Sequence, residues 1–148
     1  MFQQNFPINI ENVNVLNDKN IKQFNELRDP GTEWDETEGK KFLKNTDNAL
    51  FLAFTKDNVV GFLTAHRLQR LDKRKAEILI YEIDVSSNFR QMGIGKALLT
   101  KVKEWAGHVE ADEVWVLTNR SNEAGMALYK SSGGTTESAD EQMFTFKI

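Results

Sequence analysis

The run AEILIYEIDV (residues 76–85) constrains the fold more than any other segment, because it is apolar along most of its length. A short run of this kind is typical of a central strand that is buried on both faces. A stretch with two glycines, NFRQMGIGKALLT (88–100), follows it, and a second short apolar run occupies 113–118. Between the two runs, apolar side chains recur at helical spacing, at Ile94, Ala97, Leu98, Val102 and Trp105. Strand, helix and strand in this order predict a parallel pair of strands.

The first half of the chain contains further strand patterns. Residues 8–15 alternate between apolar and polar side chains, as a half-buried strand does. Two β-prone runs, at 49–55 and 59–68, flank the turn sequence Lys56-Asp57-Asn58. This arrangement predicts an antiparallel hairpin.

Two further helices have recognisable ends. Asn17 or Asp18 can cap a helix that stops before Pro30. Asn122 opens a later helix, and Gly133 with Gly134 ends it.

The C-terminal residues suggest a closing hairpin with strands at 135–137 and 142–148. No linker divides the chain. We therefore expect one mixed α/β domain over residues 1–148.

The composition excludes several kinds of site and partner. The 148-residue chain has no cysteine, which leaves no disulfide, thiolate ligand or cysteine nucleophile. Its two histidines, His66 and His108, are far apart in sequence, so we expect no metal. A net charge of −3 gives no sign of a nucleic-acid partner. The start MFQQNFPINI lacks the pattern of a signal peptide, and no apolar run could span a membrane. We expect a cytoplasmic protein without a membrane partner.

The glycine stretch can be tested against three phosphate-binding loops. A P-loop requires wider glycine spacing and a hydroxyl residue where Ala97 stands. A Rossmann loop requires a third glycine where Leu98 stands. The pattern [Q/R]-x-x-G-x-[G/A] is matched by Arg90, Gly93 and Gly95. Glycines let backbone N–H groups approach phosphates, and the positive end of the following helix favours anions.

This third pattern resembles the loop with which the GNAT acyltransferase superfamily holds the pyrophosphate of coenzyme A. A second GNAT signature, N-x-x-[A/G]-x-x-L-Y-x-x-x-G, is matched by NEAGMALYKSSG (122–133) after the next predicted strand. Gly134 departs from the family, which usually has an aromatic or apolar residue there. The resemblance implies a single GNAT-like α/β domain. Its mixed, mostly antiparallel sheet would have a central parallel pair splayed around the cofactor, with helices on both sides.

The resemblance also implies that acetyl-CoA is the acetyl donor. It places the donor on the loop, on the N–H groups at the end of the preceding strand and on one asparagine. The implied residues are Ile83, Asp84, Val85, Arg90, Gln91, Met92, Gly93, Ile94, Gly95, Lys96 and Asn122. The alternative for Asn122 is a plain helix cap, and the two roles are compatible.

Transfer of acetyl to an amine needs a base, because an amine with a pKa near 10.4 is mostly protonated at pH 7. By resemblance Glu82 is the base, and Asp84 is the second candidate. Glu82 could instead be paired with a nearby arginine or lysine. Tyr129 would protonate the departing thiolate, and its alternative is a tyrosine packed in the core. No covalent enzyme intermediate is needed for direct attack in a ternary complex.

A narrower resemblance concerns the acceptor. Residues 51–99 are similar to the gentamicin-type aminoglycoside 3-N-acetyltransferases, which have a similar hairpin and a similar strand before the loop. Acidic side chains would attract a polycationic substrate. They occur in two groups, Glu33, Asp35, Glu36 and Glu38, and then Glu137, Asp140 and Glu141. We select Trp34, Asp35, Glu36 and Glu141 as candidate substrate-binding residues, although charge runs are commonly solvated surface.

Other functions fit the same motifs. The acceptor could be a polyamine, an amino acid or a protein amine, and a non-catalytic acyl-CoA sensor could share the fold. The partner we expect is a small-molecule amine. The resemblance also implies a possible homodimer.

Overall fold

The structure is a computed structural model that describes residues 6–148. The chain divides into two compact units, Met1–Leu117 and Thr118–Ile148. The first unit contains a sheet and three α-helices, and the second contains one α-helix. Each unit is described separately below.

The first unit is built on a five-stranded sheet with the order β1-β2-β3-β4-β5. The strands are β1 (Asn9–Asn12), β2 (Asn48–Thr55), β3 (Asn58–Leu68), β4 (Ala76–Val85) and β5 (Ala111–Val116). The first four strands pair antiparallel, and β4 pairs with β5 in parallel. This confirms the predicted mixed sheet, its hairpin and its one parallel pair. The predicted strand at 8–15 is shorter than expected.

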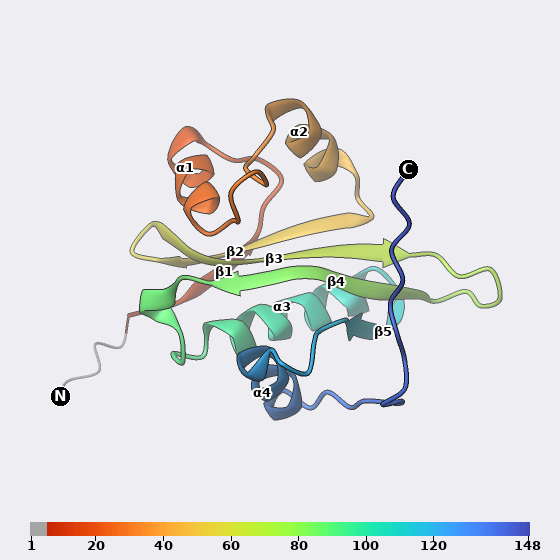
Figure 1. Cartoon of the computed structure of the whole chain (residues 1–148). Helices are drawn as coiled ribbons and strands as arrows, with labels where there is room; N and C mark the ends of the chain where they lie inside the picture. Colours follow the sequence, from red (N-terminus) through yellow and green to blue (C-terminus); the bar gives the residue numbers. More distant parts are fainter. Residues whose placement is uncertain (1–5) are drawn as a thin grey trace. The chain divides into compact units, whose positions relative to one another are not determined.

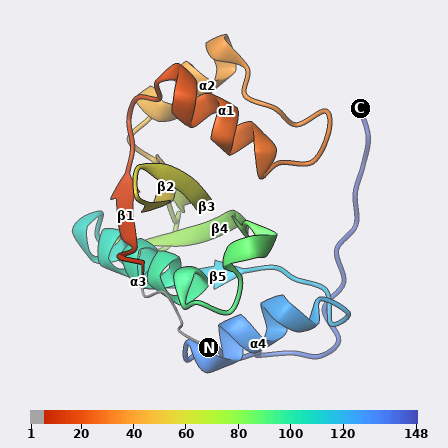
Figure 2. The same ribbon diagram turned by 90° about the vertical axis from the view of Figure 1, so that its left-hand side faces the viewer.

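Helices cover both faces of this sheet. Helices α1 (Asp18–Glu26) and α2 (Glu36–Lys44) lie on one face, and α3 (Ile94–His108) lies on the other (Figures 1 and 2). The side chain of Asn17 caps α1 by accepting a hydrogen bond from the N–H of Asn20 at 2.8 Å. Of the two predicted caps, Asn17 is therefore the one that is used.

Alternation along the central strands divides the core between these faces. Leu50 and Leu52 of β2 join Phe24 of α1 and Phe62 of β3 in one cluster, against which both α1 and α2 pack. The rings of Phe24 and Phe62 meet edge to face at 5.0 Å. Phe51, between the two leucines, instead contacts Trp105 of α3. Successive strand residues point to opposite faces, so β2 contributes to both halves of the core.

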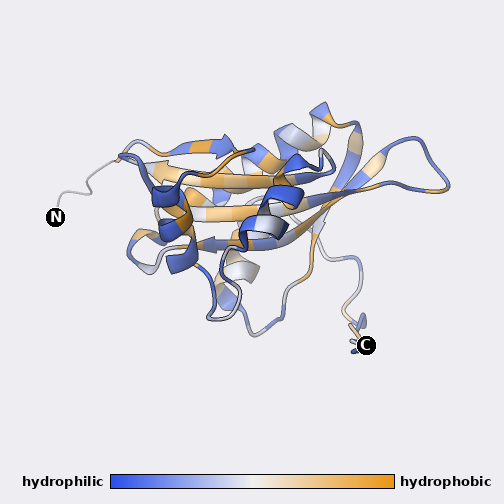
Figure 3. Cartoon of the chain, turned by 90° about the horizontal axis from the view of Figure 1, so that it is seen from above, coloured by the Kyte–Doolittle hydropathy of each residue, from blue (hydrophilic) through white to orange (hydrophobic). Residues whose placement is uncertain are grey.

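Two connections in this unit join β2 to β3 and β3 to β4. Lys56 and Asp57, with φ of 49° and 64°, form the tight turn between β2 and β3. A two-residue turn with two positive φ values matches the twist of a hairpin. A longer connection, 69–75, joins β3 to β4 and is mostly hydrophilic (Figure 3).

A bulge interrupts β4 near its middle. Glu82 pairs with Thr64, but the next pair is Ile80 with Ala65, so Tyr81 is an extra residue in β4. A bulge of this kind bends the strand and redirects the side chains beside it. The pairing of β4 with β3 from Glu82 to Val85 is therefore shifted by this one residue.

The end of β4 lacks a neighbour on one side. Strands β4 and β5 pair as far as Ile80 and Val116, whereas β4 continues to Val85 beside β3 alone. Ala76, Ile78 and Ile80 are buried and lie on one face, whereas Leu79 between them is only partly buried and Tyr81 is exposed, so the expected burial on both faces is wrong for this strand. The C-terminal half of β4 is thus an open strand edge.

The second unit contains α4 (Glu123–Ser131), capped by Asn122 as predicted. Gly133 has φ of +89° and ends the helix, and the N–H of Gly134 donates to the carbonyl of Tyr129 at 2.9 Å. A Cβ on Gly134 would lie 2.9 Å from that oxygen, which accounts for the glycine where the family usually has a larger residue. Glycine suits this helix-terminating geometry.

The predicted closing hairpin is wrong. Residues 132–148 contain no strand. Strand patterns specify a strand only where backbone groups find a partner, and neither 135–137 nor 142–148 has strand pairing.

Candidate functional site

The glycine loop presents backbone donors at the start of α3. Gly93 is the residue before the helix and has φ of +81°, and Gln91 has φ of 59°. The first intrahelical hydrogen bond of α3 comes from the N–H of Ala97 to the carbonyl of Gly93. The N–H groups from Gly93 to Lys96 consequently have no acceptor within the described residues. Such a row of donors at a helix start suits a phosphate.

Side chains around the loop leave this surface open. A Cβ on Gly93 would meet no atom within 4 Å. Ile94 turns inward and is 2% exposed, so only its backbone is available to a ligand. Lys96 is exposed and has no ion pair in the part of the chain that is described. The residues present therefore fit the diphosphate of coenzyme A.

We expect Gly93→Ala to weaken both the fold and donor binding. The left-handed conformation at Gly93 costs an alanine about 1 kcal/mol, which should appear in the free energy of unfolding. The dissociation constant of acetyl-CoA, measured by calorimetry, should rise about tenfold, as for one lost charge-assisted hydrogen bond.

Gly107 in α3 offers a matched control. A Cβ there also meets no atom within 4 Å, but the backbone is helical without a positive φ. Gly107→Ala should raise the free energy of unfolding by up to about 1 kcal/mol and leave the acetyl-CoA dissociation constant unchanged. Equal acetyl-CoA affinity in both variants would contradict a donor site at Gly93.

The predicted donor residues at the end of β4 are linked to one another. The carboxylate of Asp84 accepts from the N–H of Val85 at 2.8 Å and from Arg90 at 3.4 Å. Arg90 also donates from Nε to the carbonyl of Val85 at 3.1 Å. The Val85 N–H is thus already occupied, and a role in holding acetyl-CoA would require Asp84 to turn away. Met92 is exposed on the same loop.

Glu82 is held by an arginine that sequence patterns did not identify. Arg28, just after α1, contacts both carboxylate oxygens of Glu82, at 3.0 and 3.1 Å. The hydroxyl of Thr64 donates to the same carboxylate at 3.0 Å. Arg28 also donates to the carbonyl of Thr32 and lies against the rings of Phe24 and Phe62. The predicted alternative for Glu82, a carboxylate paired with an arginine, is what the structure contains.

This pairing leaves Glu82 accessible. Its side chain is 33% exposed, whereas that of Arg28 is 15% exposed. Both hydrogen bonds to this carboxylate fall on Oε2, whereas Oε1 makes only the 3.0 Å ion-pair contact with Arg28. A carboxylate oxygen has about two acceptor positions, so Oε1 can accept a further hydrogen bond.

The candidate substrate residues near α2 have local structural roles. Asp35 caps α2 by accepting from the N–H groups of Thr37 and Glu38. The ring of Trp34 covers Gly39 so closely that a Cβ there would lie 2.4 Å from it. Hydrogen bonds from Lys40 and then from the Trp34 indole hold the pKa of Glu36 below its ordinary value. Of these three, Glu36 alone presents an exposed charge without capping a helix, and its substrate role stays a prediction.

The second unit contains the other two principal candidates. The side chain of Asn122 accepts from the N–H of Gly125 and donates to Thr118, each at 3.1 Å. Asn122 therefore caps α4, whatever further role it has. Burial raises the pKa of Tyr129 above its ordinary value of 10.0, and its hydroxyl makes no hydrogen bond within the described chain. Glu141 lies in the exposed segment after α4.

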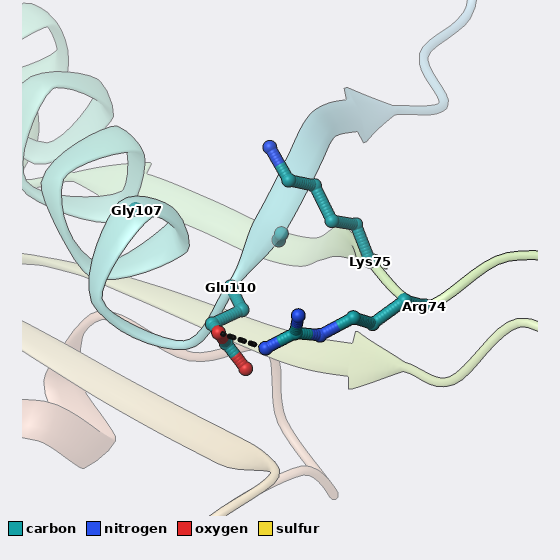
Figure 4. A pocket seen from close by; sticks show the side chains of 5 residues that line it. Arg74, Lys75, Gly107 and Glu110 are labelled. Atoms are coloured by element: carbon teal, nitrogen blue, oxygen red, sulfur yellow. Dashed lines mark hydrogen bonds and ion pairs between the residues drawn. The ribbon is translucent and has the colours of Figure 1, made fainter.

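The basic residues of the β3–β4 connection lie far from the glycine loop, at the start of β4. A shallow pocket of about 330 Å³ lies there, lined by Arg74, Lys75, Gly107, Glu110 and Ala111 (Figure 4). Arg74 is paired with Glu110 at 3.2 Å, and Lys73 with Asp112 at 3.3 Å. Lys73 and Arg74 are thus each neutralised by an acidic neighbour.

Within residues 6–148, no group of three or more histidine or acidic side chains could hold a metal ion. None of the helices in the same residues combines the length and the apolar character needed to cross a bilayer.

Comparison with protein families identifies the family of proteins that share this loop. A model described as the acetyltransferase (GNAT) family matches residues 16–133. The chain belongs to the acetyltransferase (GNAT) family. The match covers both predicted motifs, and the enzyme class predicted from them is that of the family.

Individual relatives are more distant. Human N-acetyltransferase 8 is 29% identical over 94 residues, which are 64% of this chain and 41% of that protein. The chain therefore spans less than half the length of this relative.

Solved structures support the same fold over the whole chain. An aminoglycoside acetyltransferase from an uncultured soil metagenomic sample, in complex with trehalose, is 25% identical, with 98% of this chain and 97% of that chain covered and a TM-score of 0.78. Aminoglycoside N-acetyltransferase AAC(6′)-Iy in complex with CoA is 21% identical, with 99% of both chains covered and a TM-score of 0.79. The chain thus has the single α/β GNAT fold predicted from sequence, with a mixed five-stranded sheet flanked by helices.

Sequence patterns missed the groups around Glu82. Arg28 is 54 residues from Glu82 in sequence, and Thr64 is 18 residues away. Arg28 has no local signal beyond its place before Asp29-Pro30. Only the register of β3 and β4 and the packing of α1 bring these groups together.

Proposed function

We propose that the chain is an N-acetyltransferase that transfers acetyl from acetyl-CoA to a primary amine of a polycationic small molecule. The observation that carries the proposal is the open row of N–H donors from Gly93 to Lys96, directly after a strand that contains the carboxylate of Glu82. Membership of the family supports acetyl-CoA as the donor. Lys96 adds a positive charge beside the loop, and the guanidinium of Arg90 lies there as well, paired with Asp84 at 3.4 Å.

The chemistry assigned to this chain has three parts. Glu82, or Asp84 as second candidate, takes the proton of the acceptor amine, directly or through water. The amine nitrogen then attacks the thioester carbonyl, which N–H groups of residues 83–85 polarise, that of Val85 only once Asp84 has turned away from it. Tyr129, whose phenol is protonated at neutral pH because burial raises its pKa, donates its proton to the departing thiolate. The nitrogen then loses its second proton to the Tyr129 phenolate as the amide forms. Asn122 hydrogen-bonds the pantetheine arm.

For the acceptor we propose an aminoglycoside, acetylated at the 3-amino group. Similarity of residues 51–99 to the gentamicin-type enzymes supports this position. The structural relatives include AAC(6′)-Iy, so the 6′-amino group is the competing position. Exposed acidic groups such as Glu36 and Glu141 would attract the polycation.

The test is thiol release from acetyl-CoA with gentamicin, kanamycin, spermidine and a lysine peptide, followed by mass spectrometry of the product. We expect turnover of the two aminoglycosides and an acetyl group on N3. Acetylation at N6′ would support the enzyme class but would replace N3 by N6′ as the acetylated position. Turnover of spermidine or the peptide alone would overturn the aminoglycoside acceptor. Binding of acetyl-CoA without transfer to any amine would favour an acyl-CoA sensor.

A further inference from the structure

The bulge in β4 gives two adjacent residues the same direction. Tyr81 contacts His66, and the ring of His66 contacts Phe42 of α2. Glu82 contacts Arg28, just after α1. Helices α1 and α2 lie on one face of the sheet (Figure 2). Adjacent residues of a regular strand point to opposite faces, so the bulge is what brings Tyr81 and Glu82 to the same face.

The three rings form a row that runs outward from the core. Phe42 and His66 meet edge to face at 5.6 Å, and so do His66 and Tyr81. A hydrogen-bond contact of 2.8 Å between Nδ1 of His66 and the side chain of Asn48 fixes the central ring. Edge-to-face contacts of this kind favour one orientation of the outer ring.

Tyr81 ends this row in solvent. Its side chain is 68% exposed, and its hydroxyl makes no hydrogen bond within residues 6–148. A tyrosine whose ring contacts the protein on one side only and is otherwise exposed contributes little to the packing of the core. It presents an apolar ring surface next to the carboxylate of Glu82.

We propose that Tyr81 is the acceptor-recognition residue, a platform for a saturated ring that carries ammonium groups. The ring packs its C–H surface on Tyr81 and directs an amine to Glu82. An aromatic surface attracts ammonium groups as well as apolar C–H groups, and both occur on such a ligand. This inference rests on the proposed function, because it assigns the acceptor side of the same site.

The experiment compares Tyr81→Ala with Tyr81→Phe, using kanamycin and acetyl-CoA with the full chain. For Tyr81→Ala we expect the KM of kanamycin to rise about 3- to 30-fold, the range of one aromatic–cation contact. The kcat and the KM of acetyl-CoA should stay within twofold. Tyr81→Phe should keep the wild-type KM, because the ring surface remains. The KM of kanamycin in Leu71→Ala, a fully exposed residue of the β3–β4 connection, should also be unchanged.

Calorimetric titration of kanamycin without acetyl-CoA separates this inference from the proposed function. Weaker binding by Tyr81→Ala than by the wild type supports the platform even if no acetyl is transferred, a result that would overturn the proposed function alone. Acetyl transfer by the wild type with an unchanged kanamycin KM in Tyr81→Ala would overturn the platform alone. No binding of kanamycin by the wild type would overturn the platform as well.

Discussion

Glu82→Gln is expected to lower kcat by about 10²- to 10⁴-fold, the usual contribution of a general base. Glutamine has nearly the same shape but cannot take the proton of the acceptor amine. The measurement is steady-state thiol release with saturating acetyl-CoA and acceptor. The KM of acetyl-CoA should change little, because the N–H donors from Gly93 to Lys96 are untouched.

The same substitution also removes an ion pair, so a matched control is required. Arg28→Gln removes the partner from the 3.0 Å contact but keeps the carboxylate of Glu82. Both variants should lose free energy of unfolding, roughly 1–3 kcal/mol each, since each leaves a partly buried polar group without its partner.

The comparison of the two variants decides the role of Glu82. If Glu82 is the base, Arg28→Gln retains most of its kcat while Glu82→Gln does not. If Glu82 only anchors the segment after α1 to the sheet, the two variants lose kcat equally. Asp84→Asn is the third variant to compare. A loss of kcat confined to Asp84→Asn would assign the base role to Asp84 instead of Glu82.

Tyr129→Phe should lower kcat about 10²-fold, the lower end of the range for an acid catalyst. We choose the lower end because a thiolate leaves readily, thiols having a pKa near 8.5. The free energy of unfolding should be nearly unchanged, since the Tyr129 hydroxyl makes no hydrogen bond within the described residues. A kcat within twofold of the wild type would contradict the acid role.

The pH dependence gives a second test of Tyr129. Burial raises its pKa above 10.0, so the phenol remains protonated as pH rises through neutrality and up to about pH 10. Ionisation of Tyr129 would therefore reduce activity only above that value. Any alkaline decline below pH 10 must come from another group and should persist in Tyr129→Phe. Loss of such a decline in the variant would contradict the raised pKa.

Local sequence determined much of the fold of this protein. The bounds of β4 agree with the apolar run at 76–85, and Asn17 and Asn122 cap the helices that follow them, because strand burial and helix capping depend on neighbouring residues. The glycine loop was identified for the same reason, since its backbone geometry is specified by Gly93 itself. The hairpin expected at 135–148 failed because a strand also needs a partner, which a local pattern does not supply.

Tertiary structure alone decided what surrounds the predicted base. Glu82 could be selected from its place in β4, but its pairing with Arg28 depends on how the end of α1 packs on the sheet. The direction of Tyr81 depends on the register of β3 against β4, which shifts at the bulge. These contacts join residues 15 to 54 positions apart in the chain. The periodicity of one segment does not show which residues far away in the sequence will contact it. Only the packed sheet therefore places an arginine and an aromatic row beside Glu82.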